Sequence, residues 1–159
     1  MVITELPLPW KSGASSLPDN HAQAYKRLMS IKRRLETNDS FKSMYVSTMN
    51  GYIGKGYAES VPMWEQIKTG KNVLYLPHHG VLKNKGAAKL RVVFDCAATC
   101  GGTSLNKQLN IGPDLLNNFC RFFLRFRQYS CTLVVDIDAM FHQVKVAESD
   151  RDSLRFPWW

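Results

Sequence analysis

Apolar side chains recur at helical spacing in two neighbouring segments near the start of the chain. In the first segment the intervals are four, three and four residues: Ala24, Leu28, Ile31 and Leu35. This spacing predicts a helix over residues 20–36, with Asp19 or Asn20 as its cap. A second helix is predicted to begin at Asn38 or Asp39 and to end at two glycines, with an apolar stripe made of Phe41, Met44, Tyr45, Met49 and Tyr52. The two helices together predict a helical hairpin.

After residue 73 the pattern changes to short apolar runs that are typical of strands. Strands are predicted over residues 73–76, 80–82 and 90–95, and the loop between the last two predicts a β-hairpin. Four cations lie in this loop and on the strand that follows it: Lys83, Lys85, Lys89 and Arg91. Such a hairpin is suited to close over a triphosphate, because its cations pair with phosphate oxygens while its tip can move. Lysines that only keep the tip soluble are the simpler alternative.

A third helix and a buried strand are predicted in the second half of the chain. Gly112-Pro-Asp114 is a typical helix start, and the apolar spacing predicts that the helix packs against the sheet through Leu116, Phe119, Phe123 and Phe126. The run 131–135 predicts a strand buried on both faces, because it is largely apolar and does not alternate. A last strand is predicted within residues 150–159.

The predicted strand 131–135 leads directly into Asp136, which has two interpretations. A carboxylate at the end of a buried strand is costly to desolvate, and a bound cation is one way to compensate it. Alternatively, Asp136 caps the turn that follows, since Asp is among the favoured capping residues. The residues alone leave both interpretations open.

The amino-acid composition indicates a class of binding partner and a cellular compartment. The formal net charge of +8 favours a polyanionic partner, and nucleic acid is the commonest one for a basic domain, although basic chains that bind nothing also exist. The four cysteines lack zinc-finger spacing, so we expect buried, reduced thiols in an intracellular protein: Cys96, Cys100, Cys120 and Cys131. The apolar runs are too short to cross a bilayer, so no membrane partner is expected. Prolines and a Gly/Ser patch predict that residues 1–19 form an extended lead-in without regular structure.

Ordered motifs along nearly the whole chain resemble those of one known family. The first ones are Leu8-Pro-Trp10, Leu17-Pro-Asp-Asn20, Gly56-Tyr-Ala-Glu59, Tyr75-Leu-Pro-His-His79 and Arg91-Val-Val-Phe-Asp-Cys96. The later ones are Gly102-Thr-Ser-Leu-Asn106, Gly112-Pro-Asp-Leu-Leu116, Leu124-Arg-Phe-Arg127, Asp136-Ile-Asp-Ala-Met-Phe-His-Gln-Val144 and Asp150-Arg-Asp-Ser-Leu-Arg-Phe156. No single motif is specific. The series as a whole resembles the reverse transcriptase region of Bel/Pao-type LTR retrotransposons, which follows the protease in the Pol polyprotein.

The resemblance implies an α+β chain that is part of a right-hand polymerase. Residues 1–19 are then the lead-in, residues 20–130 a fingers-like region and residues 131–159 the truncated start of the palm. In chain order this fold is a helical hairpin, a β-hairpin, a helix and the first palm strands. The implied reaction is RNA-directed DNA synthesis by nucleotidyl transfer. The implied partners are an RNA or DNA template-primer, a deoxynucleoside triphosphate and the rest of the polyprotein.

The family also implies roles for individual residues. Asp136 matches the palm aspartate that binds both catalytic Mg²⁺ ions, and the backbone carbonyl of Ile137 is an implied further ligand. This match favours the metal-binding interpretation of Asp136 over the capping one. The residues implied to contact the incoming nucleotide are Arg91, Lys85, Ala139, Met140 and Phe141. Among these, Lys85 matches the phosphate lysine, and Phe141 matches the bulky residue that blocks a ribose 2′-hydroxyl.

The chain departs from the family pattern in one respect that bears on activity. Reverse transcriptases complete the metal site with an aromatic-x-Asp-Asp hairpin, and no Asp-Asp pair occurs in this sequence. One carboxylate cannot organise a two-metal site, so we expect this chain alone to be inactive. The alternatives are a catalytically dead or domesticated nucleic-acid-binding remnant and, more weakly, a remnant that neither folds nor binds. The family implies a cytoplasmic location, which includes virus-like particles.

Overall fold

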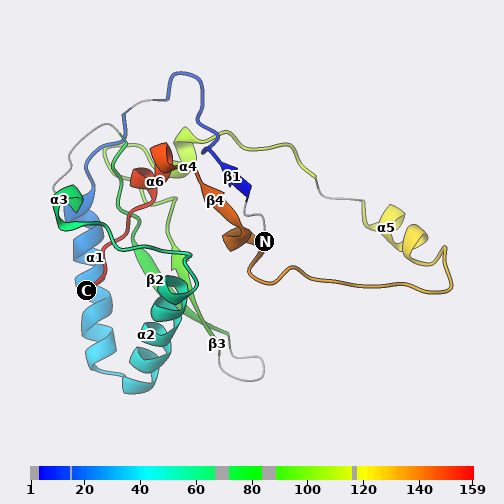
Figure 1. Ribbon diagram of the computed structural model, residues 1–159, viewed down its shortest axis with the longest axis horizontal. Coiled ribbons are helices and arrows are strands. Elements are labelled where there is room, and N and C mark those ends of the chain that lie inside the picture. The colour runs from blue at the N-terminus through cyan, green and yellow to red at the C-terminus, as the bar shows by residue number, and fades with distance from the viewer. Residues whose placement is uncertain (1–3, 15, 67–71, 84–88, 116–117) are drawn as a thin grey trace.

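The described residues form an α+β structure in which helices are interspersed with short strands, and these strands make two separate two-stranded sheets (Figure 1). This computed structural model describes residues 4–14, 16–66, 72–83, 89–115 and 118–159. Its strands are β1 (Thr4–Leu6), β2 (His78–Lys83), β3 (Lys89–Phe94) and β4 (Val144–Val146). Its helices are α1 (His21–Glu36), α2 (Asp39–Gly54), α3 (Met63–Gln66), α4 (Leu105–Gln108), α5 (Phe119–Phe126) and α6 (Glu148–Arg151), with 3₁₀ turns η1 (Met140–Gln143) and η2 (Asp152–Leu154). None of the described helices is both long and apolar enough to span a membrane.

The helical hairpin predicted from the sequence is confirmed by α1 and α2. The buried positions lie on the predicted faces and are Ala24, Leu28 and Leu35 in α1 and Phe41, Tyr45 and Met49 in α2. The Asn38 side chain accepts a hydrogen bond of 2.9 Å from the Phe41 N–H and so caps α2. Asn20 does not cap α1 with its side chain. It exchanges two hydrogen bonds with the backbone of Tyr75 instead, at 2.7 and 2.8 Å, and ties α1 to the segment before the hairpin.

The predicted β-hairpin is also confirmed, although its tip lies outside the described residues. Strands β2 and β3 are antiparallel, with His78 opposite Phe94 and Lys83 opposite Lys89. Leu90 and Val92 point into a core shared with Leu35 of α1 and with Phe41, Tyr45 and Met49 of α2. The hairpin therefore uses one face for packing on α2, and Arg91 lies on its exposed face.

A glycine sets the distance between the hairpin and α2. A β-carbon placed on Gly80 would lie 2.9 Å from atoms of both Phe41 and Tyr45. Such a distance is well inside van der Waals contact, so the backbone of β2 approaches the two rings more closely than any residue with a side chain allows. Gly80 thereby lets two large aromatic rings seat directly on the sheet.

Both backbone and side-chain hydrogen bonds hold the C-terminal segment on the rest of the protein. The Leu74 N–H donates to the Asp152 carbonyl at 3.0 Å, and the Leu76 N–H donates to the Arg155 carbonyl at 2.6 Å. Strands were predicted over residues 73–76 and within residues 150–159, and both predictions are wrong. Between these two segments the structure has an isolated parallel bridge, which pairs Tyr75 with Arg155. Pro157 has no N–H to donate to a ladder, but its carbonyl accepts a hydrogen bond of 2.9 Å from His78. The Tyr45 hydroxyl donates to the other ring nitrogen of His78 at 2.6 Å, and burial raises the pKa of Tyr45 while it lowers the pKa of His78. The pair is therefore a buried neutral link between α2, β2 and the C-terminal segment.

The prediction that residues 1–19 lack regular structure is wrong for Thr4–Leu6. These residues form β1, which pairs in parallel with β4, the strand that ends at Val146. The carboxylate of Asp150 then accepts hydrogen bonds from the Leu8 N–H at 2.8 Å and from the Trp10 indole at 3.0 Å. Partners about 140 residues away along the chain fix this segment, and a local pattern cannot reveal them.

Two predictions for residues 112–135 are wrong. The third helix begins at Phe119, where Asn118 caps it, and not at the proline of Gly112-Pro-Asp114. Three residues of its predicted packing face, Phe119, Phe123 and Phe126, are exposed, so this helix does not pack on a sheet; the fourth, Leu116, lies outside the described residues. Residues 131–135 carry no strand, and their side chains are exposed. A strand buried on both faces needs neighbours on both sides, and the described part of the chain places none there.

The close approach at Gly80 gives a prediction about stability. Gly80→Ala forces the hairpin away from Phe41 and Tyr45, so we expect the free energy of unfolding to fall by about 1–3 kcal/mol in urea denaturation. Gly51→Ala is the matched control, because its β-carbon would meet nothing within 4 Å on α2. That control is expected to gain about 0.5–1 kcal/mol from helix propensity. Equal effects of the two substitutions would contradict the packing described here.

Candidate functional site

Residues 111–115 and 118–138, called the arm below, lie away from the rest of the protein, with α5 at the far end (Figure 1). The arm starts after Asn110, whose backbone N–H donates to the Pro9 carbonyl at 2.7 Å. Many large apolar side chains along it are exposed: Ile111, Leu115, Phe119, Phe122, Phe123, Leu124, Phe126, Tyr129, Leu133, Val134, Val135 and Ile137. The arm therefore concentrates unburied apolar surface, which in proteins typically marks an interaction site.

Asp136 lies on the returning limb of the arm and is exposed. Its carboxylate accepts a hydrogen bond of 3.0 Å from the N–H of the next residue, Ile137. Val135 before it and Ile137 after it are 77% and 61% exposed, so nothing rigid encloses the carboxylate. The expectation that Asp136 ends a buried strand is wrong for this chain, because the apolar run before it has no sheet to join. Its carboxylate is open to solvent and to cations.

The residues after Asp136 form an ordered turn. Ala139 has a left-handed backbone with φ of 49°, and its carbonyl accepts the His142 N–H at 2.7 Å as η1 begins. The Gln143 side chain donates to the Asp138 carbonyl at 3.1 Å and closes the turn. Met140 and Phe141 point outward and are 49% and 85% exposed. Of the residues implied to meet a nucleotide, the turn therefore presents Met140 and Phe141 to solvent, whereas Ala139 is half-buried.

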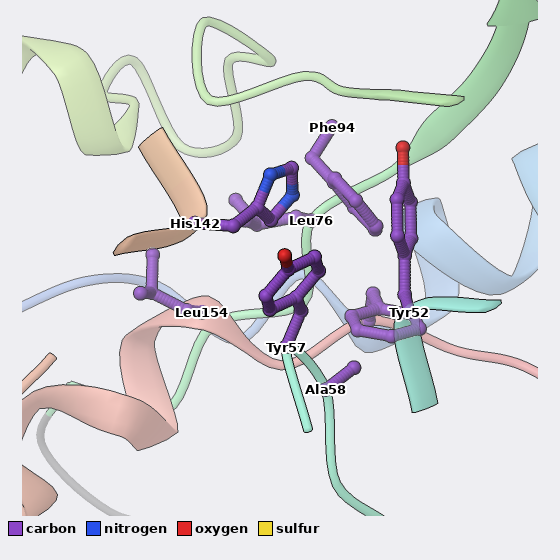
Figure 2. A pocket seen from close by; sticks show the side chains of 8 residues that line it. Tyr52, Tyr57, Ala58, Leu76, Phe94, His142 and Leu154 are labelled. Carbon is purple, nitrogen blue, oxygen red and sulfur yellow. The ribbon is translucent and has the colours of Figure 1, made fainter. Parts of the chain in front are cut away.

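His142 fixes this turn to the body. Its ring stacks on Tyr57 at a centroid distance of 4.6 Å and lies 5.2 Å from the ring of Tyr52 (Figure 2). Partial burial lowers the pKa of His142, and the charge of Lys55 lowers it further. Tyr52 belongs to the C-terminal part of α2, so the base of the arm is anchored on the helical hairpin. Sequence reasoning gave no role to His142 or Tyr57, because residues 85 positions apart meet only in the folded chain.

Arg91 is not brought to Asp136 by this structure. Arg91 lies on the exposed face of β3, opposite Val81. Within the described residues no hydrogen bond or ion pair joins it to Asp136, and Lys85 lies outside the described residues. No three His, Cys, Asp or Glu side chains gather into a metal-binding group in the part of the chain that the structure describes. The described members of the predicted site thus lie on two separate elements, Arg91 on β3 and the others within residues 136–141.

The cysteines divide between the body and the arm. Cys120 and Cys131 lie on the arm and are exposed, so the expectation of buried thiols is wrong for these two. Cys96 is half-buried, and burial, helped by the charge of Asp95, raises the pKa of its thiol. Thiol chemistry can therefore report whether the arm is open.

We predict that labelling with a thiol reagent at pH 8 modifies Cys120 and Cys131 first. Thiolate is the reactive form, so the raised pKa and partial burial of Cys96 should slow its labelling by roughly ten-fold. Mass spectrometry assigns the labelled sites, and Cys131→Ser is expected to remove one fast-reacting thiol. Protection of Cys131 in the folded wild-type chain would show that the arm is packed.

Comparison with known proteins gives this chain neither a family nor a fold relative. No family model matches it, and no curated protein or solved structure does so either. The function proposed below therefore rests on the residues and on their arrangement.

Proposed function

We propose that this chain is the fingers and the first half of the palm of a Bel/Pao-type reverse transcriptase. One observation carries the proposal: Asp136-Ile-Asp-Ala-Met-Phe141 occupies a single exposed segment and is the last but one of an ordered series of motifs. The fold is α+β with a helical hairpin that packs on a β-hairpin, as the resemblance implies for the fingers. The net charge of +8 supports a template-primer as partner.

The residues around Asp136 fit Mg²⁺ as a partial ligand set. The carboxylate of Asp136 and the backbone carbonyl of Ile137 are oxygen donors of the kind that Mg²⁺ prefers. Mg²⁺ typically takes one or two carboxylates and completes its shell with water and substrate phosphates. When bound, the ions stabilise the attacking and the leaving oxygens of nucleotidyl transfer. Because one carboxylate cannot hold two ions, the remaining acidic ligands have to come from the rest of the polyprotein.

The exposed residues of the two elements have complementary roles in nucleotide binding. Arg91 pairs with phosphate oxygens, as a planar guanidinium does well, and Lys85 supplies a further cation from the hairpin tip. Ala139 and Met140 lie against the deoxynucleoside triphosphate. The ring of Phe141, which is 85% exposed here, leaves no room for a 2′-hydroxyl and so excludes ribonucleotides. These roles require that the hairpin and the arm approach each other over the substrate.

A nucleic-acid-binding protein without chemistry is the second candidate. The described residues contain no group of three metal-binding side chains, which favours this candidate. The exposed Arg91 is suited to phosphate binding under either candidate. In this case the chain binds nucleic acid through backbone phosphates, and the affinity falls steeply with salt. The two candidates differ only in whether Asp136 is required.

Primer extension with Mg²⁺ tests the proposal in protein expressed from the full reading frame that contains this chain. We expect Asp136→Asn to reduce extension by roughly 10³-fold or more, because removing a metal ligand removes electrostatic stabilisation of the transition state. Asp138→Asn is the matched control, since its carboxylate lies two residues away and is assigned no metal. Salt-dependent binding of the template-primer without extension, or equal losses in the two variants, would favour the second candidate.

A further inference from the structure

A pocket of about 250 Å³ lies where the base of the arm meets the helical hairpin (Figure 2). Its walls include the rings of Tyr52, Tyr57, Phe94, Phe156 and His142. Leu76, Leu154 and the small side chain of Ala58 complete a largely apolar lining. The pocket belongs to none of the roles assigned above, although His142 follows Phe141 directly.

The aromatic walls of the pocket are fixed by contacts with one another. The rings of Phe94 and Phe156 are 4.9 Å apart, and those of Tyr52 and Phe94 are 6.5 Å apart at an angle of 42°. His142 is held against Tyr57 at 4.6 Å. These distances are typical of interacting aromatic rings, so the walls are preformed. Because its volume lies below the 300–1,000 Å³ of drug-sized sites, the pocket suits a ligand of one or two rings.

The polar groups at the pocket narrow the choice of ligand. The Tyr57 hydroxyl and the His142 imidazole lie near each other in the pocket lining, and each is able to hydrogen-bond to the edge of a flat ring (Figure 2). The ammonium of Lys55 lies 5.9 Å from the centre of the Tyr57 ring. This neighbouring cation disfavours a cationic ligand and favours a neutral, electron-rich ring with acceptor atoms at its edge.

We propose that this pocket binds a nucleobase. Stacking on aromatic side chains is how proteins hold unpaired bases, and every base offers a flat face and a hydrogen-bonding edge. The choice of a nucleobase over other flat rings follows from the net charge of +8 and in that respect rests on the proposed function. The base comes either from a free nucleoside or from a single strand whose phosphates meet nearby cations such as Lys55.

Fluorescence of 2-aminopurine tests the proposal without metal ion or triphosphate, so its outcome is independent of Asp136. Stacking on aromatic rings quenches this base, and the probes are its free riboside and a single-stranded tetranucleotide that contains it. Quenching by the wild-type chain with both probes identifies the base alone as the ligand, whereas quenching with the tetranucleotide only identifies a base within a strand. Quenching with neither probe overturns the proposal.

Variants show whether the quenching arises in the pocket. Tyr57→Leu removes one aromatic ring from the pocket wall. Ala58→Phe places a large side chain in the pocket and keeps every aromatic ring. Each variant is expected to weaken binding roughly ten-fold or more. Tyr57→Phe keeps the ring and removes only the hydroxyl, so it should lose less affinity than Tyr57→Leu. Tyr25→Leu is the matched control, because Tyr25 is a half-exposed tyrosine of α1 that does not line the pocket. Binding that is unchanged in Ala58→Phe, with folding verified by circular dichroism, overturns the proposal.

Discussion

The contact between the aromatic face of α2 and the backbone of β2 organises the body of this protein. Phe41 and Tyr45 lie directly on Gly80, and a side chain at that position would push the helix and the hairpin apart. Tyr45 is fully buried there and also holds His78, whose other ring nitrogen holds the carbonyl of Pro157. The same contact thus joins the helical hairpin, the β-hairpin and the C-terminal segment. Elements distant in sequence share one core because the backbone at Gly80 can approach the rings of Phe41 and Tyr45 closely.

The arm obeys a different constraint. Many of its side chains are large and apolar, yet in the described structure they contact solvent. Exposed apolar surface of this extent is unfavourable by roughly 25 cal/mol for each Å² that a partner could bury. Covering this surface would therefore be favourable, while the stacking of His142 holds the turn that follows Asp136 against Tyr52 and Tyr57. A fixed base with an open limb explains how the turn at Ala139 is ordered although Asp136 is not enclosed.

Sequence reasoning succeeded where local periodicity and local packing agree. The stripe from Phe41 to Met49 and the pair of strands around the hairpin were predictable, because neighbouring residues decide them. It failed for β1, whose partner β4 is about 140 residues away, and for the strand predicted over 131–135, which needs neighbours that local sequence cannot supply. For the proposed site, the sequence supplied the motifs but not how their residues are arranged in space. The stacking of His142 on Tyr57, which positions the turn, left no local signal.

We propose that Asp136 belongs to a polymerase palm and that another part of the polyprotein supplies the remaining acidic ligands. Reading the coding sequence past the codon for Trp159 tests this claim most directly. The account predicts an open frame that continues to an aromatic-x-Asp-Asp sequence in a segment with strand-like alternation. A stop codon directly after Trp159, or a continued frame without such a pair, would contradict the polymerase account and leave a nucleic-acid-binding protein.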